Sequence, residues 1–319
     1  MTTCKSVANI VNLQTKVMKK SILLILVVIT VGCAIKQSKN MKSVISNEEL
    51  NNSREFFNGL GEIYKPDEDV QQVKEVISGI VYYSFTPSNA NANTLMLYAH
   101  GGSFALGGIK SHSAMMTHLA KTTKTKIIFV EYGLAPENPF PKGVNDFFKV
   151  YKALKSKNAE TKIFFGGDSA GSGIVVSALG KLKKDNVQMP NGVILISPWL
   201  NLYCNSESYV LNKEKDKILT KEELTKYANL YVGNSDMESA SPSNLVFSSF
   251  PPNLIAVGKD EVLLQESKDL NEKVKSVQPK SYIFEFENVS HVWPLTDINS
   301  DATKKIFLEI SNFINYVAN

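Results

Sequence analysis

Short apolar runs alternate with segments of helical periodicity along most of this 319-residue chain. Apolar residues recur at offsets of three, four and seven in residues 144–154 and 306–317, which is the pattern of a helix packed on one side. Several of the apolar runs are almost continuously hydrophobic, as is typical of strands covered on both faces. The alternation predicts an α/β fold with a mostly parallel sheet and helices on both faces. The predicted strands are residues 79–85, 94–99, 126–131, 162–166, 192–196, 253–257 and 281–286.

The alternation is interrupted between Trp199 and Pro251 by a long polar segment that contains one helical pattern, at residues 219–232. Residues 44–62 also have loosely helical spacing, ahead of the first predicted strand. A long insertion within an α/β sheet commonly carries function, often as a lid. We therefore expect one domain over residues 44–319, with a helical cap formed by residues 44–75 and 201–250.

The N-terminus has a pattern of its own. Residues 21–31 form an apolar run of eleven that follows two lysines, which is too short to span a bilayer but fits the core of an export signal. Gly32 and Cys33 then resemble the lipobox of bacterial lipoproteins, which implies cleavage and lipidation at Cys33, with residues 34–43 as a tether. Thr30 departs from that motif, and Met18 is an alternative start. An uncleaved anchor and a buried helix remain open. We expect an exported protein of the cell envelope, attached to lipid at Cys33.

Charge is distributed unevenly along the chain. Four lysines and no acidic residue lie in residues 1–32, and the remaining basic and acidic residues balance. Arg54 is the single arginine, so the sequence does not have the Arg/Lys clusters that bind nucleic acid. The cysteines Cys4, Cys33 and Cys204 and the four histidines do not have the spacing of a metal site. We expect no metal ion and an unpaired, packed Cys204.

The sharpest local motif is GGDSAGSG at residues 166–173, between an apolar strand and a small-residue helix. Gly167, Ser169 and Gly171 match G-x-S-x-G, a tight turn that presents a nucleophilic serine. Such a turn requires small neighbours because strand and helix would otherwise collide. A glycine-rich turn that only packs, or one that binds phosphate, is the alternative interpretation.

A second glycine-rich segment, HGGSFALGG at residues 100–108, follows the strand 94–99. Acyl transfer through a tetrahedral intermediate requires preorganised N–H donors for the oxyanion, and glycine lets the backbone approach the substrate. Gly101, Gly102 and Ala170 are the candidate donors. We expect His100 to orient this loop, with a plain histidine at a strand end as the alternative.

These two motifs together resemble the hormone-sensitive-lipase-like esterases of the α/β-hydrolase superfamily. EYGLAPENPFP at 131–141, ISPWLNL at 196–202 and SHVWPL at 290–295 continue the resemblance, which covers residues 75–315. It implies an α/β-hydrolase fold, no cofactor and hydrolysis of short- to medium-chain acyl esters, with acetyl esters and lactones among the candidates. Ser103 departs from the family, where a third glycine is common, and so does Gly133, where an arginine is usual.

The catalytic base is predicted from chain order, which in this fold runs serine, acid, histidine. His291 is the only histidine after Ser169, and it follows the last predicted strand. His112 and His118 precede the serine, and we assign them to a surface helix.

The sequence identifies the catalytic acid less directly than the base. Asp260 follows the strand 253–257, and resemblance to the family's D-x-V/L-L stretch favours it as the catalytic acid. Glu261 and Asp269 are its rivals. The predicted site is then Ser169, Asp260 and His291 acting on a small-molecule ester. A non-catalytic binding protein on the same scaffold and a serine amidase or peptidase are the alternatives, and the oligomeric state is left open.

Overall fold

A computed structural model describes residues 45–319, in which eight strands form one sheet of order β1-β2-β4-β3-β5-β6-β7-β8. All strands from β3 to β8 run parallel to one another, and β1 and β2 form an antiparallel pair at one edge. The predicted mostly parallel sheet is thus confirmed. The strands are β1 (Val70–Ile77), β2 (Ile80–Pro87), β3 (Thr94–Ala99), β4 (Lys126–Val130), β5 (Lys162–Asp168), β6 (Gly192–Ile196), β7 (Asn253–Gly258) and β8 (Ser281–Phe286).

Strand β1 is an element that the hydrophobic pattern missed. Its two end residues, Val70 and Ile77, are buried, but most of the residues between them are exposed at the sheet edge. The strand's sequence, VQQVKEVI, therefore has neither a continuous apolar run nor a regular alternation of apolar and polar residues. The prediction that residues 44–75 belong to the cap is therefore wrong at its end, because residues 70–75 pair with β2 in the sheet.

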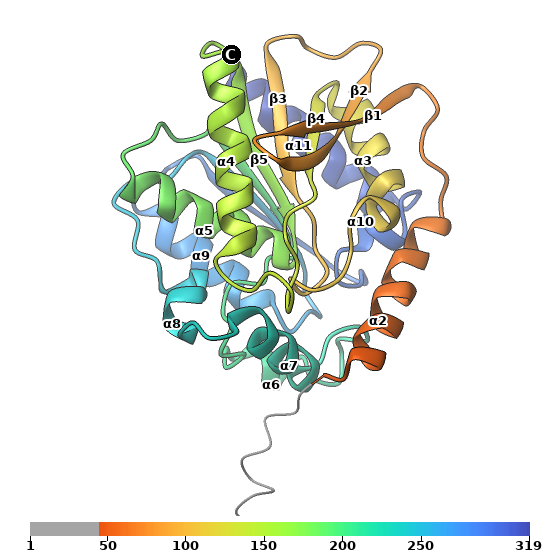
Figure 1. Cartoon of the computed structure of the whole chain (residues 1–319), viewed down its shortest axis with the longest axis vertical. Coiled ribbons are helices and arrows are strands. Elements are labelled where there is room, and N and C mark those ends of the chain that lie inside the picture. The colour runs from red at the N-terminus through yellow and green to blue at the C-terminus, as the bar shows by residue number, and fades with distance from the viewer. Residues whose placement is uncertain (1–44) are drawn as a thin grey trace, which may run out of the picture. The chain divides into compact units, whose positions relative to one another are not determined.

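Helices cover both faces of the sheet (Figure 1). One apolar core lies against α4, α5 and α9, and the other lies against α3, α10 and α11. The central strands of the sheet are buried almost completely, which explains their continuous hydrophobicity; these are β3, β4, β5, β6 and β7. These helices are α3 (Ile109–Thr123), α4 (Lys142–Lys157), α5 (Ala170–Lys184), α9 (Leu264–Lys275), α10 (Trp293–Thr296) and α11 (Asp301–Ala318).

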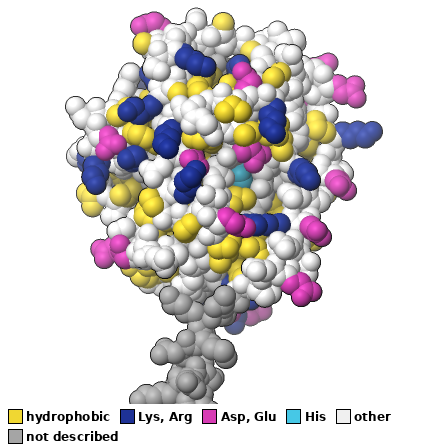
Figure 2. All heavy atoms as spheres, in the orientation of Figure 1, with side chains coloured by type: hydrophobic (Ala, Val, Ile, Leu, Met, Phe, Trp, Pro, Cys, Tyr) yellow, Lys and Arg dark blue, Asp and Glu magenta, His cyan; other side chains and the backbone are white. Residues whose placement is uncertain are grey.

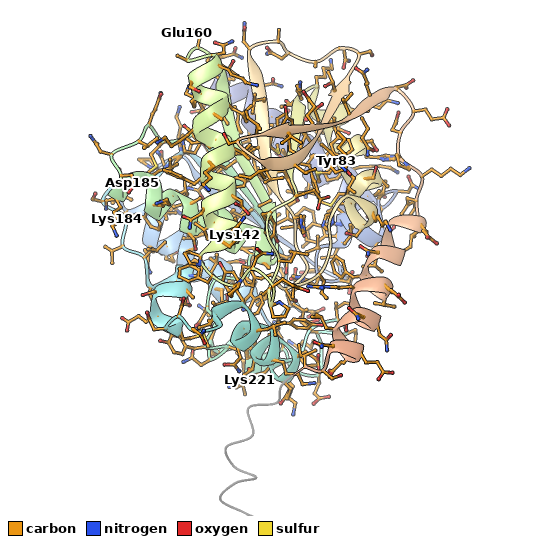
Figure 3. All side chains as sticks on the ribbon, viewed as in Figure 1. Tyr83, Lys142, Glu160, Lys184, Asp185 and Lys221 are labelled. Atoms are coloured by element: carbon orange, nitrogen blue, oxygen red, sulfur yellow. The ribbon has the colours of Figure 1, made fainter. Side chains whose placement is uncertain are left out.

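Of the remaining helices, α6, α7 and the start of α2 lie together at one end of the sheet in Figure 1. In Figure 3 Lys221, which begins α7, lies at this end and Glu160 at the opposite end, and α4 begins between them at Lys142. Because α4 begins soon after β4 ends, this is the end at which the parallel strands terminate. The helices outside the two covering layers are α2 (Asn47–Gly59), η1 (Leu60–Glu62), α6 (Ser208–Leu211), α7 (Lys221–Val232), α8 (Met237–Ala240) and η2 (Pro242–Asn244).

The proposed signal, the tether, Cys4 and Cys33 lie outside the described residues. Within residues 45–319, no helix has the length and apolar character needed to cross a membrane. Cys204 is buried, as predicted, and forms no disulfide within the described part of the chain. The exposed surface carries charges of both signs scattered among apolar side chains, as Figure 2 shows for one face, which agrees with the balanced composition of this part of the chain.

Candidate active site

Ser169 stands at the turn between β5 and α5, in a backbone conformation that non-glycine residues rarely adopt, with φ of 47°. The two glycines of the motif make this turn possible. A Cβ at Gly171 would lie 2.1 Å from the carbonyl oxygen of Ala99, and one at Gly167 would lie 2.8 Å from the carbonyl carbon of Gly171. Both contacts are too short for a side chain. The spacing of the motif therefore has the steric cause that the sequence suggested.

His291, in the loop before α10, reaches Ser169 from the far end of the chain. Its Nε2 lies 2.8 Å from Oγ of Ser169, and its Nδ1 lies 2.6 Å from Oε2 of Glu261. The carboxylate can only accept, so Nδ1 carries the proton and Nε2 is free to accept the serine proton. Hydroxyl, imidazole and carboxylate form one hydrogen-bonded series, which is the arrangement that activates a serine for nucleophilic attack.

The carboxylate in this series is Glu261, which corrects the prediction of Asp260. The other oxygen of Glu261, Oε1, accepts a 2.6 Å hydrogen bond from the Gly258 N–H and a 2.7 Å bond from the Ser197 hydroxyl. The turn after β7 thus folds the glutamate back toward the strand end. Asp260, the preceding residue, is half-buried and lines a neighbouring cavity. Its rival Asp269 is exposed on α9.

The electrostatics of His291 follow from this contact. Burial alone would lower the pKa of His291, but the charge of Glu261 and its hydrogen bond outweigh burial, so the pKa lies above its usual value. Asp216 and Asp168 add smaller contributions of the same sign. The site therefore favours the imidazolium that forms when His291 takes a proton.

The loop at residues 100–108 is held from behind through its carbonyl groups. The hydroxyl of Tyr132 donates to the His100 carbonyl at 2.6 Å, and Nδ1 of His100 lies 2.7 Å from the Gly101 carbonyl, to which it donates. In a trans peptide the N–H points away from the preceding C=O. The N–H groups of Gly101 and Gly102 are therefore aimed away from these anchors. Ala170, whose N–H is the third predicted donor, is the first residue of α5.

His100 makes this loop contact as a neutral ring. It is fully buried and stacks between Tyr132 and Phe129, at centroid distances of 4.4 and 5.2 Å. Burial, aided by repulsion from His112, lowers the pKa of His100 to about 3. A neutral ring with a proton on Nδ1 suits the predicted orienting role.

A second polar cluster lies behind Ser169, and sequence reasoning missed it. His112 was assigned to a surface helix, but it is completely buried in α3, with Nδ1 2.8 Å from Oγ of Ser111 and Nε2 3.5 Å from Asp168. Tyr98 donates to the other oxygen of Asp168 at 3.0 Å. Burial raises the pKa of Asp168, but His112 and the hydrogen bond from Tyr98 outweigh it, so the pKa falls below its usual value.

An apolar pocket of about 190 Å³ opens onto Ser169 and His291. Its walls come from both parts of the cap and from the segment after His291, and they include Phe56, Phe57, Leu60, Ile218, Leu219, Val292 and Leu295. A larger, open cavity of about 710 Å³ shares the cap residues Phe56 and Ile218 and also has the loop residue Ser103 in its wall. The cap thus encloses the space in which a substrate would meet the serine.

Gly133, where the family usually has an arginine, lies beside an ion pair. Its N–H donates to Asp146 at 3.1 Å, and Nζ of Lys142 lies 2.7 Å from the same carboxylate. A Cβ at Gly133 would contact the side chains of Asn138 and Lys142. Lys142 therefore fills the space that a side chain at position 133 would enter, and it supplies a positive charge there.

Arg54 attaches the cap to these loops. It makes two hydrogen bonds to Glu137, of 2.8 and 2.7 Å, and donates to the carbonyl groups of Ala105 and Ala135 at 2.9 Å. The single arginine of the chain therefore joins α2 to the glycine-rich loop. Among the described residues, no group of histidine, cysteine and acidic side chains is arranged to hold a metal ion.

Comparison with known proteins places this geometry in context. Residues 96–295 match a family model described as alpha/beta hydrolase fold. Among solved structures, an esterase from the bacterial hormone-sensitive lipase family superposes with a TM-score of 0.81 at 27% identity, over 85% of this chain and 92% of that one.

Among curated proteins, an esterase of Acinetobacter venetianus is 37% identical over 198 residues, or 60% of this chain and 65% of that protein. An acetyl-hydrolase of Streptomyces hygroscopicus is 31% identical over 210 residues, or 65% of this chain and 70% of that protein. An acetyl esterase of Salmonella schwarzengrund is 30% identical over 209 residues, with 61% and 63% coverage. The matched region spans about two thirds of the length of these relatives.

Proposed function

The chain belongs to the alpha/beta hydrolase fold family, and from that premise we propose that it is a carboxylic ester hydrolase with Ser169 as nucleophile, His291 as base and Glu261 as acid. The hydrogen-bonded series through these three side chains is the observation that carries the proposal. An intact series also argues against a non-catalytic binding protein, for which a paired base and acid would serve no purpose.

The reaction proceeds through an acyl-enzyme in two steps. Nε2 of His291 takes the proton of Ser169 as Oγ bonds to the ester carbonyl carbon, and the tetrahedral intermediate then expels the alcohol with that proton. Water repeats the sequence on the acyl-enzyme and releases the acid. Glu261 holds the imidazole in the required tautomer and stabilises its charged form. The N–H groups of Gly101, Gly102 and Ala170 are the proposed oxyanion donors, each of which contributes about 3 kcal/mol in comparable sites.

The proposed substrates are esters with short- to medium-chain acyl groups. The apolar pocket beside Ser169 suits an acyl chain, and several relatives are named acetyl esterase or acetyl-hydrolase. Acetylated small molecules and lactones therefore head the candidates.

Turnover of p-nitrophenyl esters from C2 to C12, together with a lactone panel and a matched anilide, tests the activity. We expect the highest kcat/KM at the short end and little cleavage of the anilide. Ser169→Ala should lower kcat by about 10⁶-fold, as removal of a serine nucleophile does elsewhere. Undiminished hydrolysis by this variant would refute the assignment, and preference for the anilide would favour an amidase.

We further propose that the protein is exported and attached to lipid through Cys33. The support is the sequence alone: two lysines, an apolar run and a Gly-Cys pair in the order of a lipoprotein signal. Mass spectrometry of the protein from its native envelope tests this. We expect a mature N-terminus at a diacylated Cys33 and retention of an unprocessed form in Cys33→Ala. An unmodified Cys33 in the mature protein would contradict the proposal.

A further inference from the structure

Three side chains of the cap, spaced four residues apart, bond to the backbone of the loop that carries Glu261. Ser208, Asn212 and Asp216 lie in and after α6, and we call them the latch. Ser208 and Asn212 are almost completely buried, although both are polar. Buried polar side chains are retained where they are hydrogen-bonded, so the partners of the latch indicate what it holds.

The partners flank the catalytic acid on both sides. Nδ2 of Asn212 donates to the carbonyl groups of Lys259 and Glu261, at 3.0 and 2.8 Å. Beyond the acid, Oδ2 of Asp216 accepts the N–H of Val262 at 2.9 Å. The hydroxyl of Ser208 donates to the carbonyl of Val262 and accepts the N–H of Gln265 at 3.1 Å.

Asp216 differs from the other two because it also holds the pocket wall. Its second oxygen, Oδ1, accepts the N–H groups of Ile218 and Leu219, each at 2.9 Å. Both of these residues line the pocket that contains Ser169 and His291. One half-buried carboxylate therefore bonds to the wall of the pocket on one side and to the acid's loop on the other.

We propose that Asp216 is a positioning residue that fixes the cap wall of the pocket relative to Glu261, and thereby couples acyl-chain selectivity to the catalytic acid. The inference rests on the proposed ester hydrolysis. Hydrogen bonds to a carboxylate are about twice as strong as neutral ones, and Asp216 accepts three. The side chain of Glu261 is held by Ser197 and Gly258, whereas its backbone is held by the latch.

Asp216→Asn is the informative variant, because an amide keeps the shape but can accept at one oxygen only. The bonds to Ile218 and Leu219 and the bond to Val262 cannot all survive. We expect kcat to fall about tenfold, and the ratio of kcat/KM for the butyrate ester to that for the acetate ester to change by about threefold or more.

Two other variants serve as matched controls. Asp260→Asn removes a carboxylate from the same cavity of about 210 Å³, next to His291, but outside the latch, and it should keep both kcat and the ratio. Asn212→Ala releases the acid's backbone and leaves Ile218 and Leu219 in place, so it should lower kcat without changing the ratio. A general loss of stability would not separate the three variants in this way.

Hydrogen–deuterium exchange supplies a readout that needs no activity. In Asp216→Asn, peptides covering 208–220 and 258–266 should exchange faster than in the wild type, while those of β5 and β6 should not change. Unchanged exchange in both peptides, or an unchanged ester ratio in an active enzyme, would overturn the proposal. A wild type that cleaves no ester would refute the proposed function instead, whatever the exchange result.

Discussion

The turn at Ser169 separates two clusters that contain the same three kinds of group, a hydroxyl, a histidine and a carboxylate. In the first, which we call the front cluster, Ser169, His291 and Glu261 are joined by hydrogen bonds of 2.8 and 2.6 Å beside the pocket. In the second, which we call the rear cluster, Tyr98 and His112 contact Asp168 at 3.0 and 3.5 Å, and all three residues are buried. Chemical composition alone therefore does not distinguish the proposed catalytic series from a buried structural cluster.

The effect of the carboxylate on His291 is seen when its pKa is compared with that of His100, a buried histidine outside both clusters. Burial lowers the pKa of both His291 and His100, but only His291 contacts a carboxylate strongly enough to raise its pKa above the usual value. His100 bonds to a carbonyl group, and its pKa falls to about 3. The front cluster is thus built to gain and lose a proton. His100, which belongs to neither cluster, stays neutral and holds the backbone of the glycine-rich loop.

Replacing one histidine in each cluster should break the comparison most clearly. His291→Ala removes the base and should lower kcat by about 10⁶-fold, because base and nucleophile act together. His112→Asn should destabilise the fold but keep kcat within about tenfold per folded molecule, a change in the barrier of about 1.4 kcal/mol or less. Kinetics with p-nitrophenyl acetate, normalised to the folded fraction, measure both. Equal losses in the two variants would contradict the division into front and rear.

The two adjacent acids sharpen the comparison within the front cluster. Glu261→Gln should lower kcat about 10⁴-fold, since an amide cannot hold the required tautomer, whereas Asp260→Asn should stay close to wild type. Removing Glu261 also removes the contact that raises the pKa of His291, and His291 must be neutral to act as base. The acidic limb of the pH profile for kcat/KM should therefore move to lower pH in Glu261→Gln. A large loss in Asp260→Asn instead would restore the original prediction.

Gly101 lies between the clusters, and a side chain there should disturb both. A Cβ would lie 2.2 Å from Oδ2 of Asp168 and 3.1 Å from Cβ of Ser169, so the loop must move. Displacing one oxyanion donor costs about 10²- to 10³-fold in kcat, and we expect a loss of that size in Gly101→Ala. Gly59→Ala is the matched control, because nothing lies within 4 Å of its added methyl group. Unchanged kcat in Gly101→Ala would remove Gly101 from the oxyanion site.

The smallest effect on turnover is expected in the rear cluster. Tyr98→Phe takes a donor from the buried carboxylate of Asp168 and should lower the free energy of unfolding by about 1–3 kcal/mol. Urea denaturation measures this loss, and kcat per folded molecule should change little. A variant that remains as stable as the wild type but loses most of its activity would assign the rear cluster to catalysis.

Much of this architecture could be predicted from the sequence. Strands 94–99, 192–196 and 281–286 have the predicted bounds, and the first two are runs of mostly buried residues. Glycine spacing indicated the turn at Ser169, and chain order indicated His291. These features are set by local sterics or by topology, both of which leave a mark in a single sequence.

The features that escaped prediction depend on contacts across the fold. Asp260 and Glu261 are neighbours, and only the path of the turn after β7 decides which carboxylate reaches His291. His112 did leave a signal, because it precedes Met116 and Leu119 by four and seven residues, on the buried face of α3. Its helical period therefore indicated burial, although nothing in the sequence paired it with Asp168.

A double variant tests most directly whether the front cluster acts as one unit. In a functioning series, Ser169→Ala and His291→Ala each abolish the same step, so the double variant should be about as inactive as either single one. Steady-state kcat for the acetate ester, measured for all three variants and the wild type, gives the answer. A double variant whose kcat is no lower than that of either single variant would support the account. A kcat reduced by the product of the two single losses would mean that the two residues act independently and would contradict it.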